Sequence, residues 1–325
     1  MKKPINLKEL ARIAGVSPST VSRLLNDEYG VGTEKSERVK KLAKEYGYKP
    51  NPIALGLKTR KSFLIGLIVP SIDDEFFSRI FSGMEVIAED TPYNILVTHA
   101  NDSEEKEEKL IRTLLDINVD GFLVSSAQLV LTNNHFELIK EAGKPLVLFD
   151  RVNQDYPYSA VAIDNYKGGE LAARHLIEKG CKEFLYVSFD KSYQNDQHRY
   201  DGFAEVLKEA GKTPERIIFK NTGYFEMEFS RLKNAADGIF CFNDRIAANI
   251  LPVLKRQGLD IPRDVKVVGF DNRTLGELTD PTLTTISQHP YDMGKKAFEL
   301  LFARLSGEET QKITLVPELI LRQST

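Results

Sequence analysis

The chain has 325 residues, of which 42% are hydrophobic and 28% charged, a composition that excludes wholesale disorder and a fibrous repeat. Its longest apolar runs, such as residues 63–70, are far shorter than the ~20 residues of a membrane-spanning helix, and no signal peptide is recognisable. Cys181 and Cys241 have no nearby cysteine or histidine that would complete a metal site. We therefore expect a cytoplasmic protein with no membrane partner, metal or cofactor.

The net charge of −3 hides an asymmetry along the chain. Residues 1–61 carry 14 Lys and Arg against 6 Asp and Glu, whereas residues 62–325 carry 30 against 41. A basic segment joined to an acidic body indicates nucleic acid bound by the first segment alone. The alternative is a solvated charged surface without a partner.

Three short amphipathic helices are predicted within residues 1–48. Asn6 has the position of a helix N-cap with Glu9 at the spacing of a capping box, and Gly15 ends this first helix. The third helix begins after Thr33 and ends at Gly47. Each helix has one apolar face, so the three are expected to pack on one another.

The second helix follows the first after a tight turn and is predicted to contact DNA. Ser17 caps it, and Pro18 takes the first helical position, where no N–H is needed. Val21, Leu24 and Leu25 give the buried face, which leaves small polar side chains and Arg23 on the opposite face. This pattern is typical of a helix-turn-helix whose second helix enters the major groove. A plain three-helix packing unit is the alternative.

Residues 49–61 are predicted to be a linker that folds only on DNA. Asn51 and Pro52 can begin a helix, but it would span about seven residues and contain Gly56, too short to be stable alone. Its apolar residues have no neighbour in sequence to cover them. We interpret the segment as a hinge helix with Leu57 as a minor-groove wedge; an ordinary linker is the alternative.

From residue 62 onward, apolar strand-like runs alternate with helices. The expected strands are 63–69, 95–98, 121–124, 146–149, 184–187, 238–242, 265–270 and 315–321, and helices are expected at 76–89, 104–115, 168–179 and 246–257. Continuous apolar strands between helices predict parallel sheets covered on both faces, and the length suits two such sheets. The Gly168-Gly169 pair lacks the rest of a nucleotide-binding motif.

Several sequence motifs, taken together, are specific enough to compare with known families. They are residues 16–26, 38–39 and 47–51, Ala54 with Leu57, and the motifs at 120–124, 149–151, 243–244, 268–272 and 281–286. Together they closely resemble the lactose/galactose repressor family of bacterial transcription regulators, along nearly the whole chain. The resemblance implies an N-terminal all-α helix-turn-helix domain and an α/β body of two Rossmann-like parallel-sheet lobes, like those of periplasmic binding proteins. It also implies a homodimer that binds double-stranded operator DNA.

The resemblance assigns domain limits. We expect the helix-turn-helix domain at 1–48, the hinge helix and linker at 49–61, and the effector-binding and dimerisation domain at 62–325. The first lobe is expected at about 62–160 plus 289–314, and the second at about 161–288 plus 315–325. The chain should cross between lobes near 149–162, near 286–290, and again before the strand at 315–321.

The DNA contacts that the resemblance implies lie on the recognition helix and the hinge. Family members often have larger polar residues where this chain has Pro18 and Ser19, so base reading here would depend more on Thr20 and Arg23. The expected contact residues are Ser17, Pro18, Ser19, Thr20, Ser22, Arg23, Asn26, Ala54, Leu57 and Lys58.

Effector contacts are expected where strands end, because ligands of open α/β sheets bind at the carboxyl ends of the strands. Carboxylates and amides there can bond hydroxyl groups, as a saccharide requires, and the resemblance directs Arg199, Asp271 and Gln288 into the same pocket. Alternatives are an N-cap role for Asp244, core packing for Phe76 and Phe77, and an Arg199–Asp271 ion pair. The expected effector residues are Asp74, Phe77, Arg151, Arg199, Tyr224, Asn243, Asp244, Asp271 and Gln288.

The function expected from this sequence is a transcription regulator, a repressor controlled by a small-molecule effector. A sugar-binding transport protein is the rival without DNA binding. An α/β enzyme lacks support, because no catalytic nucleophile, base or phosphate loop is recognisable. Within the regulators, a global catabolite regulator controlled by a phosphorylated carrier protein stays open. We expect a dimer and not a tetramer, because no heptad segment follows residues 315–321.

Overall fold

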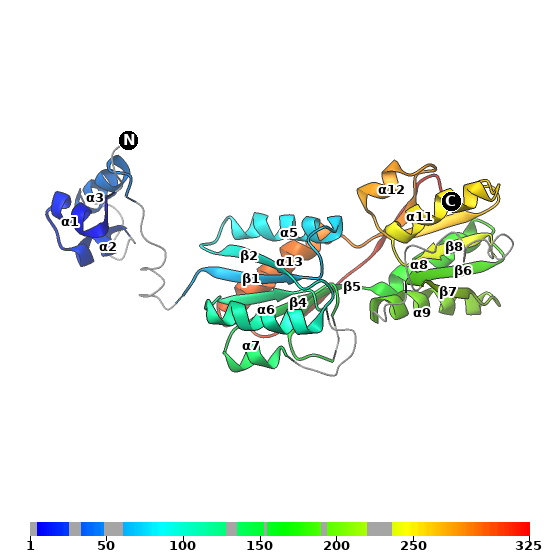
Figure 1. Cartoon of the computed structure of the whole chain (residues 1–325), viewed down its shortest axis with the longest axis horizontal. Helices are drawn as coiled ribbons and strands as arrows, with labels where there is room; N and C mark the ends of the chain where they lie inside the picture. Colours follow the sequence, from blue (N-terminus) through cyan, green and yellow to red (C-terminus); the bar gives the residue numbers. More distant parts are fainter. Residues whose placement is uncertain are drawn as a thin grey trace. The chain divides into compact units, whose positions relative to one another are not determined.

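The computed structural model describes residues 5–25, 34–48, 61–127, 135–152, 155–189, 194–219 and 236–325. The chain divides into two compact units, Met1–Ser62 and Phe63–Thr325. Figure 1 shows both units, with most of their helices and strands labelled.

The first unit contains three helices, α1 (Leu7–Ala14), α2 (Pro18–Leu25) and α3 (Glu34–Glu45). The predicted capping box is present: Asn6 Oδ1 accepts from the backbone N–H of Glu9 at 3.0 Å, and Glu9 Oε2 accepts from that of Asn6 at 2.9 Å. Gly15 ends α1 in the left-handed region, where glycine fits without strain. The helices share one hydrophobic cluster, whose fully buried members are Leu10, Ala11, Ala14, Val21, Leu24, Val39 and Ala43.

The second unit contains two six-stranded sheets. The first sheet has the order β11-β5-β4-β3-β1-β2, and all its pairs are parallel. Its strands are β1 (Leu64–Val69), β2 (Asn94–His99), β3 (Gly121–Val124), β4 (Leu146–Phe149), β5 (Ser159–Ile163) and β11 (Lys312–Leu315). Helices α5 (Glu75–Ala88) and α13 (Pro290–Leu305) pack on one face, and α6 (Glu104–Asp116) and α7 (Glu137–Glu141) on the other.

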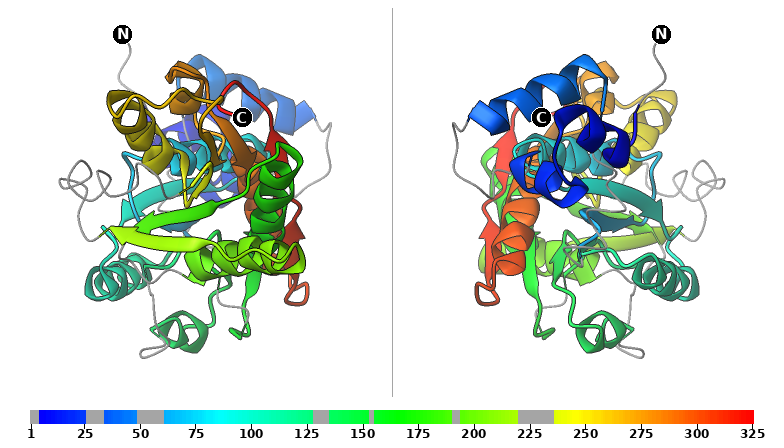
Figure 2. Two further views of the ribbon diagram at one scale, coloured as in Figure 1. Left: turned by 90° about the vertical axis from the view of Figure 1, so that its right-hand side faces the viewer. Right: turned by 90° about the vertical axis from the view of Figure 1, so that its left-hand side faces the viewer.

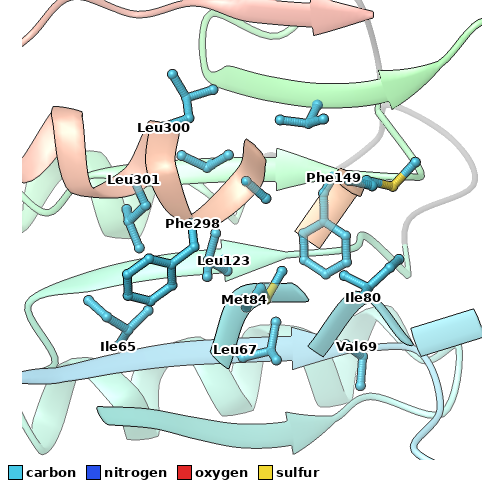
Figure 3. Close-up of a cluster of buried hydrophobic side chains, with 14 of the residues drawn as sticks. Ile65, Leu67, Val69, Ile80, Met84, Leu123, Phe149, Phe298, Leu300 and Leu301 are labelled. Carbon is cyan, nitrogen blue, oxygen red and sulfur yellow. The ribbon is translucent and has the colours of Figure 1, made fainter. Parts of the chain in front are cut away.

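Alternation along β1 shows how the sequence builds these two faces. Ile65, Leu67 and Val69 point into the cluster beneath α5 and α13, where Figure 3 shows them beside Met84 and Phe298. The intervening Ile68 belongs to the cluster on the α6 side. Because both faces are covered, the strand is apolar throughout, as the sequence predicted.

The second sheet has the corresponding order β12-β10-β9-β8-β6-β7, and its pairs are parallel except for the antiparallel β10–β12 pair. Its strands are β6 (Phe184–Phe189), β7 (Glu215–Phe219), β8 (Gly238–Cys241), β9 (Lys266–Asp271), β10 (Thr284–Ser287) and β12 (Glu318–Ile320). Helix α11 (Asp244–Arg256) covers one face, and α8 (Asn165–Glu178) and α9 (Gln194–Glu209) cover the other (Figure 2). Short α12 (Thr274–Leu278) follows β9.

The sequence interpretation needs correction at two strands near the crossings. The chain does not leave the first sheet within 149–162, because β5 extends that sheet to Ile163 before α8 begins. The strand expected at 315–321 is two strands: β11 pairs parallel with β5, and β12 pairs antiparallel with β10 of the other sheet. Residues 316–317 therefore make the third crossing, which lies inside the expected strand and not before it.

Pairs of glycines let two helices approach closely in each lobe. A Cβ on Gly83 of α5 would collide with the backbone carbonyl of Tyr291 in α13, and one on Gly294 with that of Ile80. In the second lobe, Gly169 of α8 and Gly202 of α9 meet backbone atoms of the opposing helix in the same way. Gly169 is thus a packing residue, and no phosphate loop is needed to explain it.

Candidate functional sites

The candidate DNA-contacting surface is the exposed side of α2. Ser17, Pro18, Ser19 and Arg23 are exposed, whereas Val21 and Leu24 are buried. Thr20, Ser22 and Leu25 are half-buried. The predicted faces of this helix are confirmed except at Leu25, which is less buried than expected.

Hydroxyl groups at the start of α2 form a local cluster. Ser17 Oγ accepts from the backbone N–H of Thr20 at 3.1 Å, which caps the helix as predicted. The same oxygen lies 2.8 Å from the hydroxyls of Ser19 and Thr20. Small hydroxyl side chains at a helix N-terminus can approach and bond phosphate or base-edge atoms.

Helix α3 of the same unit carries further exposed charges. They include five basic side chains, Lys35, Arg38, Lys40, Lys41 and Lys44, alongside the acidic Glu34, Glu37 and Glu45. A buried hydrogen bond from Ser36 Oγ to the carbonyl of Leu24 at 3.3 Å ties α3 to α2. Basic side chains on a fixed support attract a phosphate backbone. Four of the expected contacts, Asn26, Ala54, Leu57 and Lys58, lie outside the described residues.

A second candidate site is formed where the strands of the two-lobed unit end. Asp150 follows β4, Asp271 ends β9, and Asn243 and Asp244 follow β8. Gln288 follows β10 at a crossing between the lobes. The segments that the strand-end rule singled out do follow strands in the structure, and the contacts of their side chains are described below.

Arg199 is held inside the second lobe, 3% exposed. Its Nε donates to Asn165 Oδ1 at 2.8 Å and its Nη1 to the carbonyl of Phe242 at 2.7 Å. The guanidinium lies 3.6 Å from the centre of the Phe270 ring. Burial lowers the pKa of Arg199, and the negative charges of Asp271 and Asp150 oppose that shift. No Arg199–Asp271 ion pair is formed among the described residues.

Asp271 is bonded by two side chains of its own lobe. Arg273 Nε donates to Oδ2 at 2.7 Å, and Gln288 Nε2 donates to Oδ1 at 2.5 Å. The carboxylate is 5% exposed and sits on a backbone with φ of +116°. Such a φ is unusual for a residue with a side chain, and it turns the chain sharply at the end of β9.

Asp244 does not cap helix α11, although an N-cap role was one alternative for it. Asn243 caps α11 by accepting from the backbone N–H of Ile246 at 3.0 Å. Asp244 instead accepts from Thr285 Oγ1 at 2.5 Å and from the backbone N–H of Arg273 at 2.7 Å. Burial and the neighbouring Asp271 raise the pKa of Asp244 to about 7.

The first lobe contributes Asp150 and Arg151 to this region. Burial raises the pKa of Asp150 to about 6, against the opposing positive charges of Arg151 and Arg199. Ser125 Oγ donates to Asp150 at 3.3 Å, and Arg151 Nη1 pairs with Asp102 at 2.6 Å. Since Arg199 and Asp271 belong to the other lobe and affect Asp150, the charges of both lobes influence one another.

Two buried polar atoms at these strand ends have no hydrogen-bond partner within the part of the chain that the structure describes. They are Gln288 Oε1 and Ser188 Oγ, the latter near the carboxyl end of β6. Gln288 is 2% exposed and Ser188 0%. Buried polar groups are normally bonded, so this acceptor and this hydroxyl are candidates to bond the hydroxyl groups of a ligand. Ser188 was missed from the sequence, although its place at a strand end is a signal for it.

Phe77, which was expected to contact the effector, is buried in the core like its neighbour Phe76. Phe77 and Phe76 are 6% and 5% exposed and both belong to the hydrophobic cluster beneath α5. Their rings are in edge contact, 5.2 Å apart. This supports the core-packing alternative for both residues. Tyr224 lies outside the described residues.

Contacts between the lobes involve residues that the sequence interpretation largely missed. Arg273 Nη1 pairs with Asp74 Oδ1 of the first lobe at 2.6 Å. Thr274 bonds Glu75 through its backbone N–H and, at 2.7 Å, through its hydroxyl. Asp74 also caps α5 by accepting from the N–H of Phe76. The signal for Arg273 was its place directly after the Asp271-Asn272 strand end.

Other classes of site find no support among the described residues. Neither a cluster of side chains suited to a metal ion nor a helix long and apolar enough to cross a membrane occurs there.

Comparisons with family models match both units. Residues 6–51 match the model described as bacterial regulatory proteins, lacI family, and residues 173–325 match the periplasmic binding protein-like domain. The transcriptional regulator RegA of Clostridium saccharobutylicum is 34% identical, over 98% of this chain and 99% of its own. The PurR repressor of Vibrio vulnificus is 33% identical, over 98% of each chain. The ribose operon repressor of Halalkalibacterium halodurans is 30% identical, over 98% of this chain and 96% of its own.

Solved structures show the same architecture. A LacI-family regulator from Silicibacter pomeroyi has a TM-score of 0.80 and 27% identity, covering 99% of both chains. The CelR regulator in complex with cellobiose has a TM-score of 0.72 and 28% identity, covering 99% of this chain and 100% of its own. The Lac repressor dimer bound to its operator has a TM-score of 0.88 and covers 99% of both chains at 23% identity, which shows the shared fold.

Proposed function

Because this chain belongs to the LacI family of bacterial regulatory proteins, we propose that it is a DNA-binding transcription repressor whose operator affinity is set by a small polyhydroxyl effector bound between the two lobes. The observation that carries the effector site is the pair of unpartnered buried atoms, Gln288 Oε1 and Ser188 Oγ. One accepts a hydrogen bond and the other can donate and accept, as the hydroxyls of a sugar require.

The chemistry around these atoms favours a neutral ligand over an anionic one. Asp150, Asp244 and Asp271 lie where strands end, Asp74 lies at the start of α5, and Arg199 and Arg273 are engaged by bonds within the protein. A phosphate group would meet several carboxylates, whereas hydroxyls can donate to them. Among solved relatives, the CelR regulator is described in complex with cellobiose, which is such a polyhydroxyl compound.

The proposed mechanism is a shift between conformations of the two lobes. An effector that contacts both lobes favours one angle between them, and thereby one spacing of the two hinge segments in a dimer. Operator and effector affinity are then coupled reciprocally. Residues 49–61 would supply the hinge, with Leu57 inserted into the minor groove, and α2 would enter the major groove.

We also propose that the working form is a homodimer, because a palindromic operator needs two copies of α2 related by a two-fold axis. The catabolite-regulator alternative needs a docking site for a phosphorylated carrier protein, and none of the described contacts singles one out.

The DNA assignment is tested by gel-shift titration with operator fragments selected from random DNA. Arg23→Ala and Leu57→Ala should each weaken operator binding at least tenfold, since Leu57 offsets an unstacking cost of a few kcal/mol. Arg263→Ala, which removes an exposed arginine from the two-lobed unit, is the matched control. Unchanged affinity in both variants would contradict the assignment.

The effector assignment is tested by thermal-shift screening of the full chain against mono- and disaccharides, followed by titration. Ser188→Ala should weaken binding of any sugar that raises the melting temperature. Ser82→Ala, on the outside of α5, should leave it unchanged. A screen in which only phosphorylated sugars bind would argue against the neutral polyhydroxyl class.

A further inference from the structure

One arginine joins charged groups of the two lobes. Arg273 pairs through Nε with Asp271 of its own lobe at 2.7 Å and through Nη1 with Asp74 of the first lobe at 2.6 Å. A single guanidinium thus holds two carboxylates that come from different sheets. Its fork of donors suits this role, because its nitrogens can serve separate acceptors in fixed geometry.

The backbone fixes the direction in which Arg273 projects. Asp271 and Asn272 have φ values of +116° and +55°, so the chain reverses sharply after β9. Arg273 donates its backbone N–H to Asp244 Oδ2 at 2.7 Å. Arg322 Nη2 holds the side chain of Asn272 at 2.8 Å. The arginine therefore extends from an anchored support.

The same segment makes a second link between the lobes. Thr274, at the start of α12, bonds Glu75 at the start of α5, and Arg79 Nη2 donates to Thr274 Oγ1 at 3.1 Å. These groups are more exposed than the Arg273 contacts. The side chains of Arg79 and Glu75 are 47% and 31% exposed, against 14% for Arg273, 25% for Asp74 and 5% for Asp271.

Partial burial makes the Arg273 contacts the stronger of the two links. Exposed ion pairs are screened by water and contribute little, whereas a pair removed from water interacts more strongly. Burial alone would lower the pKa of Arg273, but the charges of Asp271 and Asp74 raise it above its ordinary value. The guanidinium therefore stays charged at every pH at which the protein is folded.

We propose that Arg273 is a latch that holds the two lobes together when no effector is bound, and that an effector reaches Asp271 only in competition with it. The competition between Arg273 and an effector rests on the proposed function. The latch itself, a cation site built from Asp74 and Asp271, concerns the ligand-free protein alone. Both carboxylates only accept hydrogen bonds, so whatever replaces Arg273 there must present donors such as hydroxyls.

Chemical rescue by guanidinium tests the latch without a known effector. Arg273→Ala should lower the melting temperature of the full chain by roughly 3 °C, as loss of one partly buried ion pair implies. Guanidinium chloride at about 5–20 mM, far below denaturing concentrations, should restore it in a saturable way. Sodium chloride at equal ionic strength should not.

Two further variants control this rescue. Arg263→Ala removes an arginine that pairs only with Asp260 and Asp264 of its own lobe, so guanidinium should not raise its melting temperature. Adding Asp74→Asn to Arg273→Ala removes half of the site and should weaken the rescue several-fold. Rescue that is absent, or equal in the Arg263 and Arg273 variants, would overturn the cation site.

Lobe separation is measured by the distance between spin labels on Asp116→Cys and Lys208→Cys, exposed positions in the first and second lobe. In the unliganded chain, Arg273→Ala and, separately, Asp74→Asn should broaden and lengthen the distance distribution. Guanidinium should reverse this only in the Arg273 variant. Identical distributions in the parent and both variants would overturn the latch. Failure of the parent to bind any operator in gel-shift assays would instead contradict the proposed function and leave this result standing.

Discussion

The two lobes of the larger unit share one plan and differ in their chemistry. Both sheets have the same strand order, and both bring two helices together through a pair of glycines. In the second lobe, Arg199, Asp244 and Asp271 form short bonds to residues of their own lobe. In the first lobe, Asp150 accepts a longer hydrogen bond from Ser125, and Asp74 pairs with Arg273 of the other lobe. The second lobe thus prearranges its buried charges through its own residues, whereas the first lobe contributes a carboxylate that is paired across the lobes.

The largest expected change in stability tests the close helix packing that both lobes share. Gly202→Ala and Gly294→Ala should each lower the free energy of unfolding by about 3 kcal/mol or more, since the added methyl group meets backbone that cannot yield without separating the helices. Gly276→Ala is the control, because its methyl group would meet only ordinary contacts. Urea denaturation measures all three. A mild effect in one lobe alone would show that its helices can move apart.

The next prediction compares a buried arginine of the second lobe with a more exposed arginine of the first. Arg199→Ala should lower the free energy of unfolding by about 3 kcal/mol, because it leaves buried carboxylates without their counter-charge and removes two hydrogen bonds. Arg151→Ala in the first lobe, where the side chain is 20% exposed and pairs with Asp102, should cost about 1 kcal/mol. Equal losses would contradict the view that the second lobe carries the prearranged charges.

The pH dependence of stability gives a smaller effect. Burial raises the pKa of Asp150 from its ordinary value near 3.8 to about 6, so the folded chain binds this proton more tightly than the unfolded chain. The corresponding stability is present below about pH 4 and is lost as the pH rises through about 6. Asp150→Asn should therefore raise the free energy of unfolding at pH 8 by about 1–3 kcal/mol and change it little at pH 4.

Denaturation of the parent and the variant at both pH values measures this difference. Asparagine tolerates the positive φ at residue 150, so the backbone should not obscure the comparison. Asp244, whose pKa burial and Asp271 raise to about 7, should act in the same direction in the second lobe. A gain in stability for Asp150→Asn that is equal at pH 4 and pH 8 would contradict the burial explanation.

The smallest expected change in stability concerns two buried serines. Ser188→Ala in the second lobe should change the free energy of unfolding by less than about 1 kcal/mol, because its hydroxyl has no partner to lose. Ser125→Ala in the first lobe should cost about 1 kcal/mol, because it removes a hydrogen bond to Asp150. A larger loss for Ser188→Ala than for Ser125→Ala would mean that Ser188 is bonded in solution.

The sequence predicted the architecture well where strands are strongly apolar. Residues 121–124 and 146–149 are strands with the expected limits. Three strands were missed, because β5 consists largely of small residues, β10 is Thr-Thr-Ile-Ser, and β7 begins with two charged residues. The apolar run at 315–321 hid the break at Pro317, since hydrophobicity does not show which sheet a strand joins.

At the candidate sites, features set by neighbouring residues in the sequence could be predicted, whereas contacts between distant residues could not. The cap at Ser17 and the burial of Val21 and Leu24 in α2 follow from spacing alone. The strand-end rule singled out Asp244 and Asp271, but after β4 it selected Arg151 in place of its buried neighbour Asp150. Which partner each carboxylate takes depends on residues far along the chain, so Arg273 and its contact with Asp74 could not be derived. Phe77 was misjudged because a helix start gives no signal of which aromatic ring faces the core.

The three crossings between the lobes govern how the protein can be made and recombined. β11 pairs with β5 across about 150 intervening residues, and the β12 strand that completes the second sheet follows it directly. During synthesis, each sheet lacks an edge strand until these residues leave the ribosome, so the two lobes reach completion almost together. For the same reason, a chimera that exchanges one whole lobe with a relative needs three junctions, at about residues 164, 288 and 316.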